Sequence, residues 1–200
     1  NNIMVIFFTS YCCHESEPLV QQILAQWKEL NPQICFKYFS DEDVKTFFKQ
    51  TPYYELYSKM RNGVAIADLF RICYIYYFGG YWFDLDLPPT RIPYDLDHPV
   101  HLFDLGYGNI SYMFIGGKPK QTLYGEVINR VLNNIACNLP ERKQAIIDIT
   151  GPRNIQNIIC QQLGIENRDN NLPAPKNATI MLKDTPYEFL YQKFPITTGT

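Results

Sequence analysis

The order of apolar and polar positions predicts alternating strands and helices in the first part of the chain. An unbroken apolar run at residues 3–8 is typical of a buried strand. Apolar residues at helical spacing then follow Glu17 and predict a helix. A second apolar run at residues 34–39 predicts another strand, and Ser40 with three acidic residues behind it predicts a helix start. This alternation is typical of an α/β sheet.

The middle of the chain predicts a long helix followed by a short strand. Residues 64–78 carry an apolar stripe at helical spacing through Ile66, Leu69, Cys73 and Tyr76 or Tyr77, and Gly79-Gly80 ends it. Residues 81–83 then form a short apolar strand. Beyond it the pattern predicts strands at 102–104, 112–115, 179–182 and 188–191, and helices at 122–136, 141–149 and 154–163.

Two aspartates follow the short strand directly, at Asp84 and Asp86. Residues i and i+2 of a strand point to the same side, so two carboxylates just past its end can converge on one cation. Oxygen-only ligation suits Mg²⁺ or Mn²⁺, which proteins commonly share with substrate phosphates. Open α/β sheets also bind ligands at the carboxyl ends of their strands. The pair therefore predicts a metal-assisted phosphate site.

The preceding helix carries Asp68 and Arg71, which lie three residues apart and hence on one face. The simplest interpretation is an ion pair within the helix, worth only tenths of a kcal/mol when exposed. Because this helix ends close to the strand that leads to Asp84, both side chains are also predicted to face the same cleft. There Asp68 can accept hydrogen bonds from sugar hydroxyls and Arg71 can orient a sugar or a phosphate oxygen.

These residues resemble a known family. Residues 67–71 (ADLFR) and 76–86 (YYFGGYWFDLD) are similar to the glycosyltransferases with a DXD sugar-binding motif, among them yeast α-mannosyltransferases, bacterial capsular-sugar transferases and large clostridial glucosylating toxins. The spacing of the four charged residues matches that family without a gap. Residues 114–119 and the segment Thr150-Gly151-Pro152 resemble two further parts of it. The opening residues 3–11 and the small size also resemble the amino-terminal domain of a viral capsid glycosyltransferase.

The resemblance implies a GT-A fold, Rossmann-like with a mixed central sheet flanked by helices, and a nucleotide-sugar donor, UDP-sugar above all. It implies Mn²⁺ or Mg²⁺ held by Asp86 directly, with Asp84 on the ribose or donor sugar and on the metal through water. It further implies that Asp68 and Arg71 hold the donor sugar, and that Thr9, Ser10 and Tyr11 meet the uracil and ribose. The expected acceptor is a glycan or glycoprotein, with retention of anomeric configuration.

The chain departs from the family pattern at some positions. Tyr112 stands where family members often carry Asn, and Trp82 replaces a smaller residue. Related transferases take a third metal ligand from near the C-terminus. Here Asp184 and the terminal threonines are the candidates for that role.

Composition excludes several classes of protein. Hydrophobic residues make up 46% and charged residues 19% of the 200-residue chain, which suits one globular domain of the kind that can be excised from a longer protein. A net charge of -2 without a Lys/Arg run argues against nucleic-acid binding, and no apolar run is long enough to span a bilayer. The six cysteines form no CxxC pair. Reduced thiols and a cytoplasmic setting, the host cytoplasm for a viral protein, are therefore expected.

Two alternatives remain open from the sequence. Haloacid-dehalogenase-like phosphatases also carry an Asp-x-Asp after a hydrophobic strand, and the first aspartate is their nucleophile. Pro88 stands where such enzymes carry Thr or Val, which argues against this class. The other alternative is a non-catalytic domain that binds a sugar nucleotide.

Overall fold

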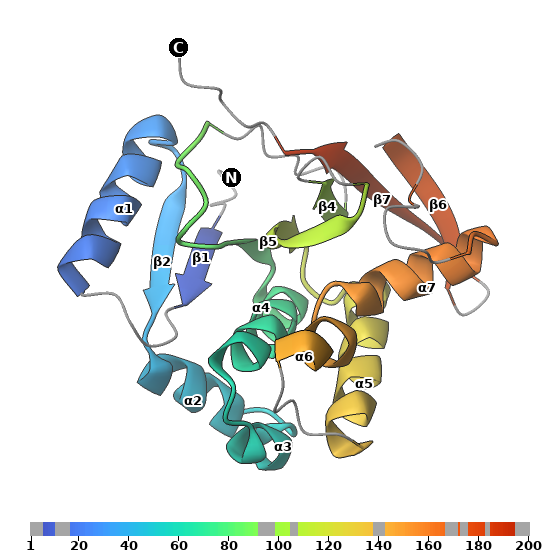
Figure 1. Cartoon of the computed structure of the whole chain (residues 1–200). Coiled ribbons are helices and arrows are strands. Elements are labelled where there is room, and N and C mark those ends of the chain that lie inside the picture. The colour runs from blue at the N-terminus through green and yellow to red at the C-terminus, as the bar shows by residue number, and fades with distance from the viewer. Residues whose placement is uncertain are drawn as a thin grey trace.

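The computed structural model describes residues 6–10, 17–91, 99–104, 108–137, 143–166, 172, 176–182 and 185–194. Its strands are β1 (Ile6–Ser10), β2 (Cys35–Phe39), β3 (Gly80–Phe83), β4 (Val100–Asp104), β5 (Ile110–Gly117), β6 (Lys176–Leu182) and β7 (Thr185–Lys193). Its helices are α1 (Glu17–Leu30), α2 (Asp41–Lys49), α3 (Tyr54–Lys59), α4 (Gly63–Phe78), α5 (Thr122–Cys137), α6 (Lys143–Ile149) and α7 (Arg153–Leu163). Figure 1 shows their arrangement.

The strands form one mixed sheet in the order β2-β1-β3-β5-β4-β7-β6. β1 pairs in parallel with both β2 and β3, whereas β5 is antiparallel to its neighbours β3 and β4. β7 is parallel to β4 and antiparallel to β6. The expected mixed α/β sheet is thus confirmed, and the carboxyl ends of β1, β2, β3, β4 and β7 share one edge.

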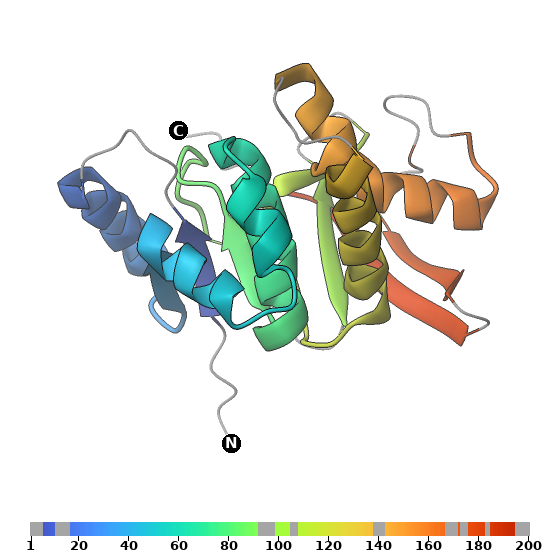
Figure 2. The same ribbon diagram turned by 90° about the horizontal axis from the view of Figure 1, so that it is seen from below.

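Alternate side chains of the strands pack into two hydrophobic cores, one on each face of the sheet. Trp82 packs with Phe8 and the apolar faces of α2 to α7 in the larger core. Its neighbours Tyr81 and Phe83 point to the opposite face, where they pack with Trp27 of α1. Figure 2 shows α4 and α5 side by side along one face of the sheet. Among the described residues, no helix is both long and apolar enough to cross a membrane.

Local sequence explains where the key helices begin and end. At the start of α2, Ser40 Oγ accepts from the Asp43 amide at 3.2 Å, and Asp43 Oδ2 accepts from the Ser40 amide at 2.9 Å, which is a capping box. α4 begins after Asn62, whose Oδ1 accepts from two amides of the first turn. α4 is capped at its end by Gly79, which has φ 71° and whose added Cβ would lie 2.9 Å from Pro119 Cδ.

Helix α4 lies deeper in the protein than the sequence pattern predicts. A single apolar stripe was expected, but ten of its residues are buried, including every residue from Ala67 to Ile75. The reason is its position between the sheet and the other helices of the larger core. Consequently its two charged residues, Asp68 and Arg71, are buried as well.

Candidate functional site

The turn between α4 and β3 brings Asp68 and Arg71 beside the aspartates that follow the strand. α4 ends at Phe78 and is capped by Gly79, and β3 begins at Gly80, so the strand runs back along the helix. The helix rises about 13 Å between Arg71 and Gly80, and an extended chain rises about 13 Å between Gly80 and Asp84. Arg71 and Asp84 therefore lie level with each other at the carboxyl end of β3.

The guanidinium of Arg71 is the centre of this cluster. Its Nη1 donates to Asp84 Oδ1 at 3.1 Å and to the Tyr112 carbonyl at 2.6 Å. Its Nη2 lies 3.2 Å from Asp68 Oδ1, and its Nε donates to the Ala67 carbonyl at 3.2 Å. The intrahelical ion pair predicted from the sequence is confirmed. It is buried and it extends to Asp84.

Trp82 supports the same cluster from β3. Its Nε1 donates to Asp84 Oδ1 at 2.6 Å, and its ring centre lies 4.3 Å from the central carbon of the Arg71 guanidinium. Stacking of this kind is favourable for a partly desolvated cation. Trp82 therefore fixes one carboxylate oxygen of Asp84, a role that was not predicted from the sequence. The signal that could have predicted it is the position of the indole, two residues before the aspartate.

Thr150 reaches the cluster from the segment between α6 and α7. Its Oγ1 donates to Asp68 Oδ2 at 3.0 Å. The following residue, Gly151, packs so closely on α6 that an added Cβ would lie 2.7 Å from Ile147 Cα. Only the resemblance to the Thr-Gly-Pro segment of the family pointed to this threonine, and the structure links it to Asp68.

Asp68 is a buried carboxylate whose pKa is raised above its ordinary value. Its side chain is 6% exposed, and burial raises its pKa to about 6. The charge of Arg71 and the hydrogen bond from Thr150 lower that pKa, whereas the negative charge of Asp84 raises it. Arg71 and Thr150 together therefore keep a costly buried charge in the folded protein.

We expect the Thr150→Val substitution to lower the free energy of unfolding by about 1.5–3 kcal/mol at pH 8, because it removes a hydrogen bond to a charged group. It should also raise the pKa of Asp68, since the hydroxyl stabilises the carboxylate. Urea unfolding and an NMR titration of the aspartate carboxyl carbons measure the two effects. Thr150→Ser, which keeps the donor, should restore the pKa, and an unmoved pKa in the valine variant would contradict the hydrogen bond.

The Asp84-Leu85-Asp86 segment is a turn and does not continue the strand. β3 ends at Phe83, the Asp84 amide donates to the Met113 carbonyl at 2.8 Å, and the Leu87 amide donates to the Asp84 carbonyl at 3.1 Å. Strand alternation therefore does not set the relation between the two carboxylates, contrary to the argument made from the sequence. The Asp84 side chain is 26% exposed, and Asp86 is exposed.

The carboxylate oxygens of the two aspartates are ligands of the type that a hard divalent cation takes. Both contacts of the Asp84 carboxylate with described residues go to Oδ1, which leaves Oδ2 available. Asp86 makes no hydrogen bond or ion pair with any residue that the structure describes. Within the same part of the chain, no group of three or more His, Cys, Asp or Glu is suited to hold a metal. A cation here would complete its shell with water or substrate phosphate, as Mg²⁺ commonly does.

The loop after β1 starts at the same edge of the sheet. Phe8 pairs with Trp82 in register, so Thr9 and Ser10 approach the level of Asp84. The Thr9 side chain is fully buried. Tyr11 lies outside the described residues, as do Asp184 and the terminal threonines proposed as a third metal ligand.

Comparison with known proteins points to one family. A family model described as "Glycosyltransferase sugar-binding region containing DXD motif" matches residues 18–98, which include Asp68, Arg71, Asp84 and Asp86. A solved structure titled "PaToxG Glycosyltransferase" has the same fold, with a TM-score of 0.55 and 10% sequence identity over 80% of this chain and 68% of that chain. No curated protein matches the chain. Through residues 18–98, the chain is similar to the glycosyltransferases that contain a DXD motif.

Proposed function

We propose that the chain is a metal-dependent glycosyltransferase of the hexosyl type that uses a UDP-sugar donor and a glycan or glycoprotein acceptor. The observation that supports this best is the pair of aspartates at the sheet edge. Asp84 has one oxygen held by Arg71 and Trp82, and two residues later Asp86 is exposed. Such an arrangement offers one pre-oriented and one accessible carboxylate to a cation.

In this proposal Asp86 and Oδ2 of Asp84 hold Mn²⁺ or Mg²⁺. When bound, the metal stabilises the charge that develops on the departing diphosphate. The protein contributes the orientation of these ligands. Because Arg71 and Trp82 fix Oδ1 of Asp84, the other oxygen is directed without a further loss of side-chain freedom.

Asp68 and Arg71 are proposed to stand against the donor sugar, as the family resemblance implies. In the structure both oxygens of Asp68 are engaged, one by Arg71 and one by Thr150. The Nη1 of Arg71 is likewise engaged by Asp84 and by the Tyr112 carbonyl. Direct contact with a sugar therefore requires that one of these bonds be exchanged on donor binding. Until then Arg71 acts as a positioning residue for both carboxylates.

The hydrogen bonds to both oxygens of Asp68 also affect how the anomeric configuration of the sugar could be retained. A protein nucleophile needs an accessible oxygen, and the Asp68 side chain is only 6% exposed. This argues against a covalent intermediate on Asp68. We propose that retention, if measured, results from attack on the same face of the sugar, with nearby carboxylates stabilising an oxocarbenium-like transition state.

The phosphatase alternative would make Asp84 the nucleophile. Its Oδ1 accepts two hydrogen bonds, from Arg71 and Trp82, which orient the carboxylate but lower its nucleophilicity. The family match at residues 18–98 also favours the transferase. The cytoplasmic setting remains part of the proposal, supported by the free thiols of Cys35, Cys73, Cys137 and Cys160.

A panel of UDP- and GDP-sugars, titrated with and without Mn²⁺, tests the proposal. We expect calorimetry to detect binding of at least one donor only when Mn²⁺ is present, and we expect that donor to be hydrolysed slowly with a KM on the order of 1 μM to 1 mM. Metal-dependent binding without hydrolysis or transfer would indicate a non-catalytic domain. Release of phosphate from phosphomonoesters without donor hydrolysis would favour the phosphatase.

A further inference from the structure

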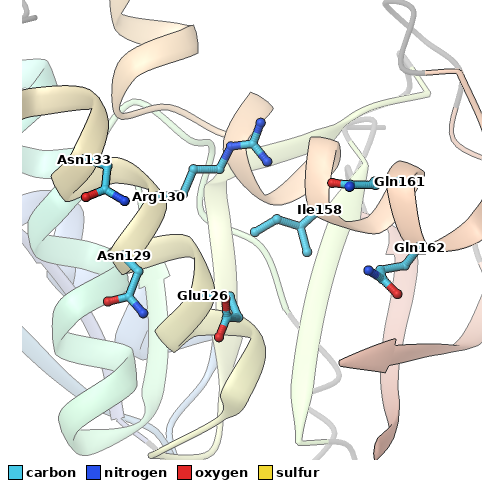
Figure 3. Close-up of a pocket in the computed structure, with 7 residues that line it drawn as sticks. All are labelled: Glu126, Asn129, Arg130, Asn133, Ile158, Gln161 and Gln162. Atoms are coloured by element: carbon cyan, nitrogen blue, oxygen red, sulfur yellow. The ribbon is translucent and has the colours of Figure 1, made fainter. Parts of the chain in front are cut away.

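The helix layer carries a cleft of about 400 Å³ between α5 and α7, away from the two aspartates. Glu126, Asn129, Arg130 and Asn133 line it from α5. Ile158, Gln161 and Gln162 line it from α7. Figure 3 shows the two sets of side chains on the two helices, with Arg130 extending from α5 toward α7. A volume of this size falls within the range of small-molecule sites.

The spacing of these residues places each set on one face of its helix. The four positions on α5 follow i, i+3, i+4 and i+7, and the three on α7 follow i, i+3 and i+4, so each set lies on one side of its helix. The buried residues of the same helices, such as Val127 and Ile159, belong to the core. The cleft therefore lies beside the apolar contact between the two helices, and Ile158 takes part in both.

The lining is rich in groups that recognise hydroxyls. Four carboxamides each supply a donor and an acceptor, and Arg130 supplies a planar set of donors. Arg130 is half-buried, yet with the residues that the structure describes it makes no hydrogen bond or ion pair, and the four carboxamides make none through their side chains. These polar groups are thus available to a ligand.

The charge of the lining narrows the class of ligand. Glu126 and Arg130 are the charged residues among the seven, so their formal charges cancel. A phosphate or a strongly acidic ligand would meet the Glu126 carboxylate. The hydroxyls of a neutral polyol would match the donors and acceptors of the carboxamides, and its C–H groups could pack against Ile158.

We propose that this cleft is a carbohydrate-binding site, distinct from the donor site, that takes a neutral oligosaccharide. Its assignment to an acceptor glycan rests on the proposed transferase function, whereas binding itself does not. A series of hydrogen bonds connects the cleft to Asp68 of the proposed donor site. Asn134 follows Asn133 of the cleft, and its side chain donates to the Ile149 carbonyl at 3.1 Å and to Asn154 Oδ1 at 2.9 Å. These two bonds hold the segment between α6 and α7. That segment includes Thr150, which donates to Asp68.

A glycan array with neutral and acidic oligosaccharides, probed with the full chain, tests the proposal. We expect neutral oligosaccharides to bind in preference to sialylated or uronate-containing ones. Calorimetry with the best neutral oligosaccharide should then give at least about tenfold weaker binding to the Asn133→Ala/Gln161→Ala variant, a loss of about 1.4 kcal/mol or more. Both residues are exposed, so the variant should fold normally.

The matched control is Gln22→Ala on α1, another exposed carboxamide, which should leave oligosaccharide binding unchanged. Donor binding should be the same in all three proteins. The proposal is overturned if no neutral oligosaccharide binds, if the double variant binds as the unmodified chain does, or if acidic glycans are preferred. Glycan binding in the cleft without any donor binding would leave this proposal standing and remove the donor proposal.

Discussion

The Asp86→Asn substitution is expected to weaken Mn²⁺-dependent binding of the donor by at least about 100-fold while leaving the free energy of unfolding unchanged. Loss of a group that merely supports a metal ligand typically costs 10–100-fold in affinity or activity, and loss of the ligand itself should cost no less. Stability should not change, because Asp86 is exposed and makes no hydrogen bond or ion pair with any described residue. Calorimetry with and without Mn²⁺ and urea unfolding measure the two quantities.

Glu29→Gln on α1 is the control, since it also removes one exposed negative charge but lies on the far side of the sheet from α4. It should alter neither the affinity nor its dependence on Mn²⁺. If Asp86→Asn bound the donor as tightly as the unmodified chain, the carboxylate of Asp86 would have no part in holding a metal. A parallel loss of stability would mean that the exposed side chain has an undescribed structural role.

Replacing Arg71 by Met should be the most destabilising single change in the cluster. The guanidinium pairs with both Asp68 and Asp84, and the Arg71 side chain is 6% exposed. Removing one partner of a buried ion pair leaves an uncompensated charge and typically costs about 3–5 kcal/mol. Urea unfolding at pH 8 measures this loss. Arg153→Met, which breaks the half-exposed pair with Asp148, is the control and should cost about 1 kcal/mol or less.

The pH dependence of the Arg71→Met variant distinguishes a lost charge pair from lost packing. The pKa of Asp68 is already raised in the folded protein, and loss of the cation raises it further. The folded state then binds a proton more tightly than the unfolded state, so stability is lost as pH rises through the folded pKa. The penalty should therefore be larger at pH 8 than at pH 5. An equal penalty at both values would indicate packing alone, and Arg71→Met/Asp68→Asn should recover part of the loss at pH 8.

Local patterns in the sequence were sufficient for most of the secondary structure. The helix from Glu17, the capped start after Ser40 and the stop at Gly79-Gly80 are all confirmed, because each depends on residues that are neighbours in the chain. α3 was missed, since its six residues follow a proline and contain two tyrosines that carry little helical periodicity. β4 begins at Val100, two residues before the strand predicted at 102–104, and so includes the buried His101.

The chemistry of the site was predictable only in part. The family resemblance pointed to Asp68, Arg71, Asp84 and Asp86, and the structure brings the first three together. The contact of Arg71 with the Tyr112 carbonyl was not predictable, because a backbone group has no signature in the sequence and β5 is distant along the chain. The turn at Asp84 was also missed, because strand alternation cannot indicate where pairing with β5 stops.

The position of Trp82 makes its intrinsic fluorescence a probe of the aspartate site. The chain has two tryptophans, and they lie on opposite faces of the sheet. Trp27 is enclosed by apolar residues, whereas the Trp82 indole is bonded to Asp84 and stacked against Arg71. Emission from Trp82 should therefore respond to the state of the aspartate beside it, whereas Trp27 lies in the other core.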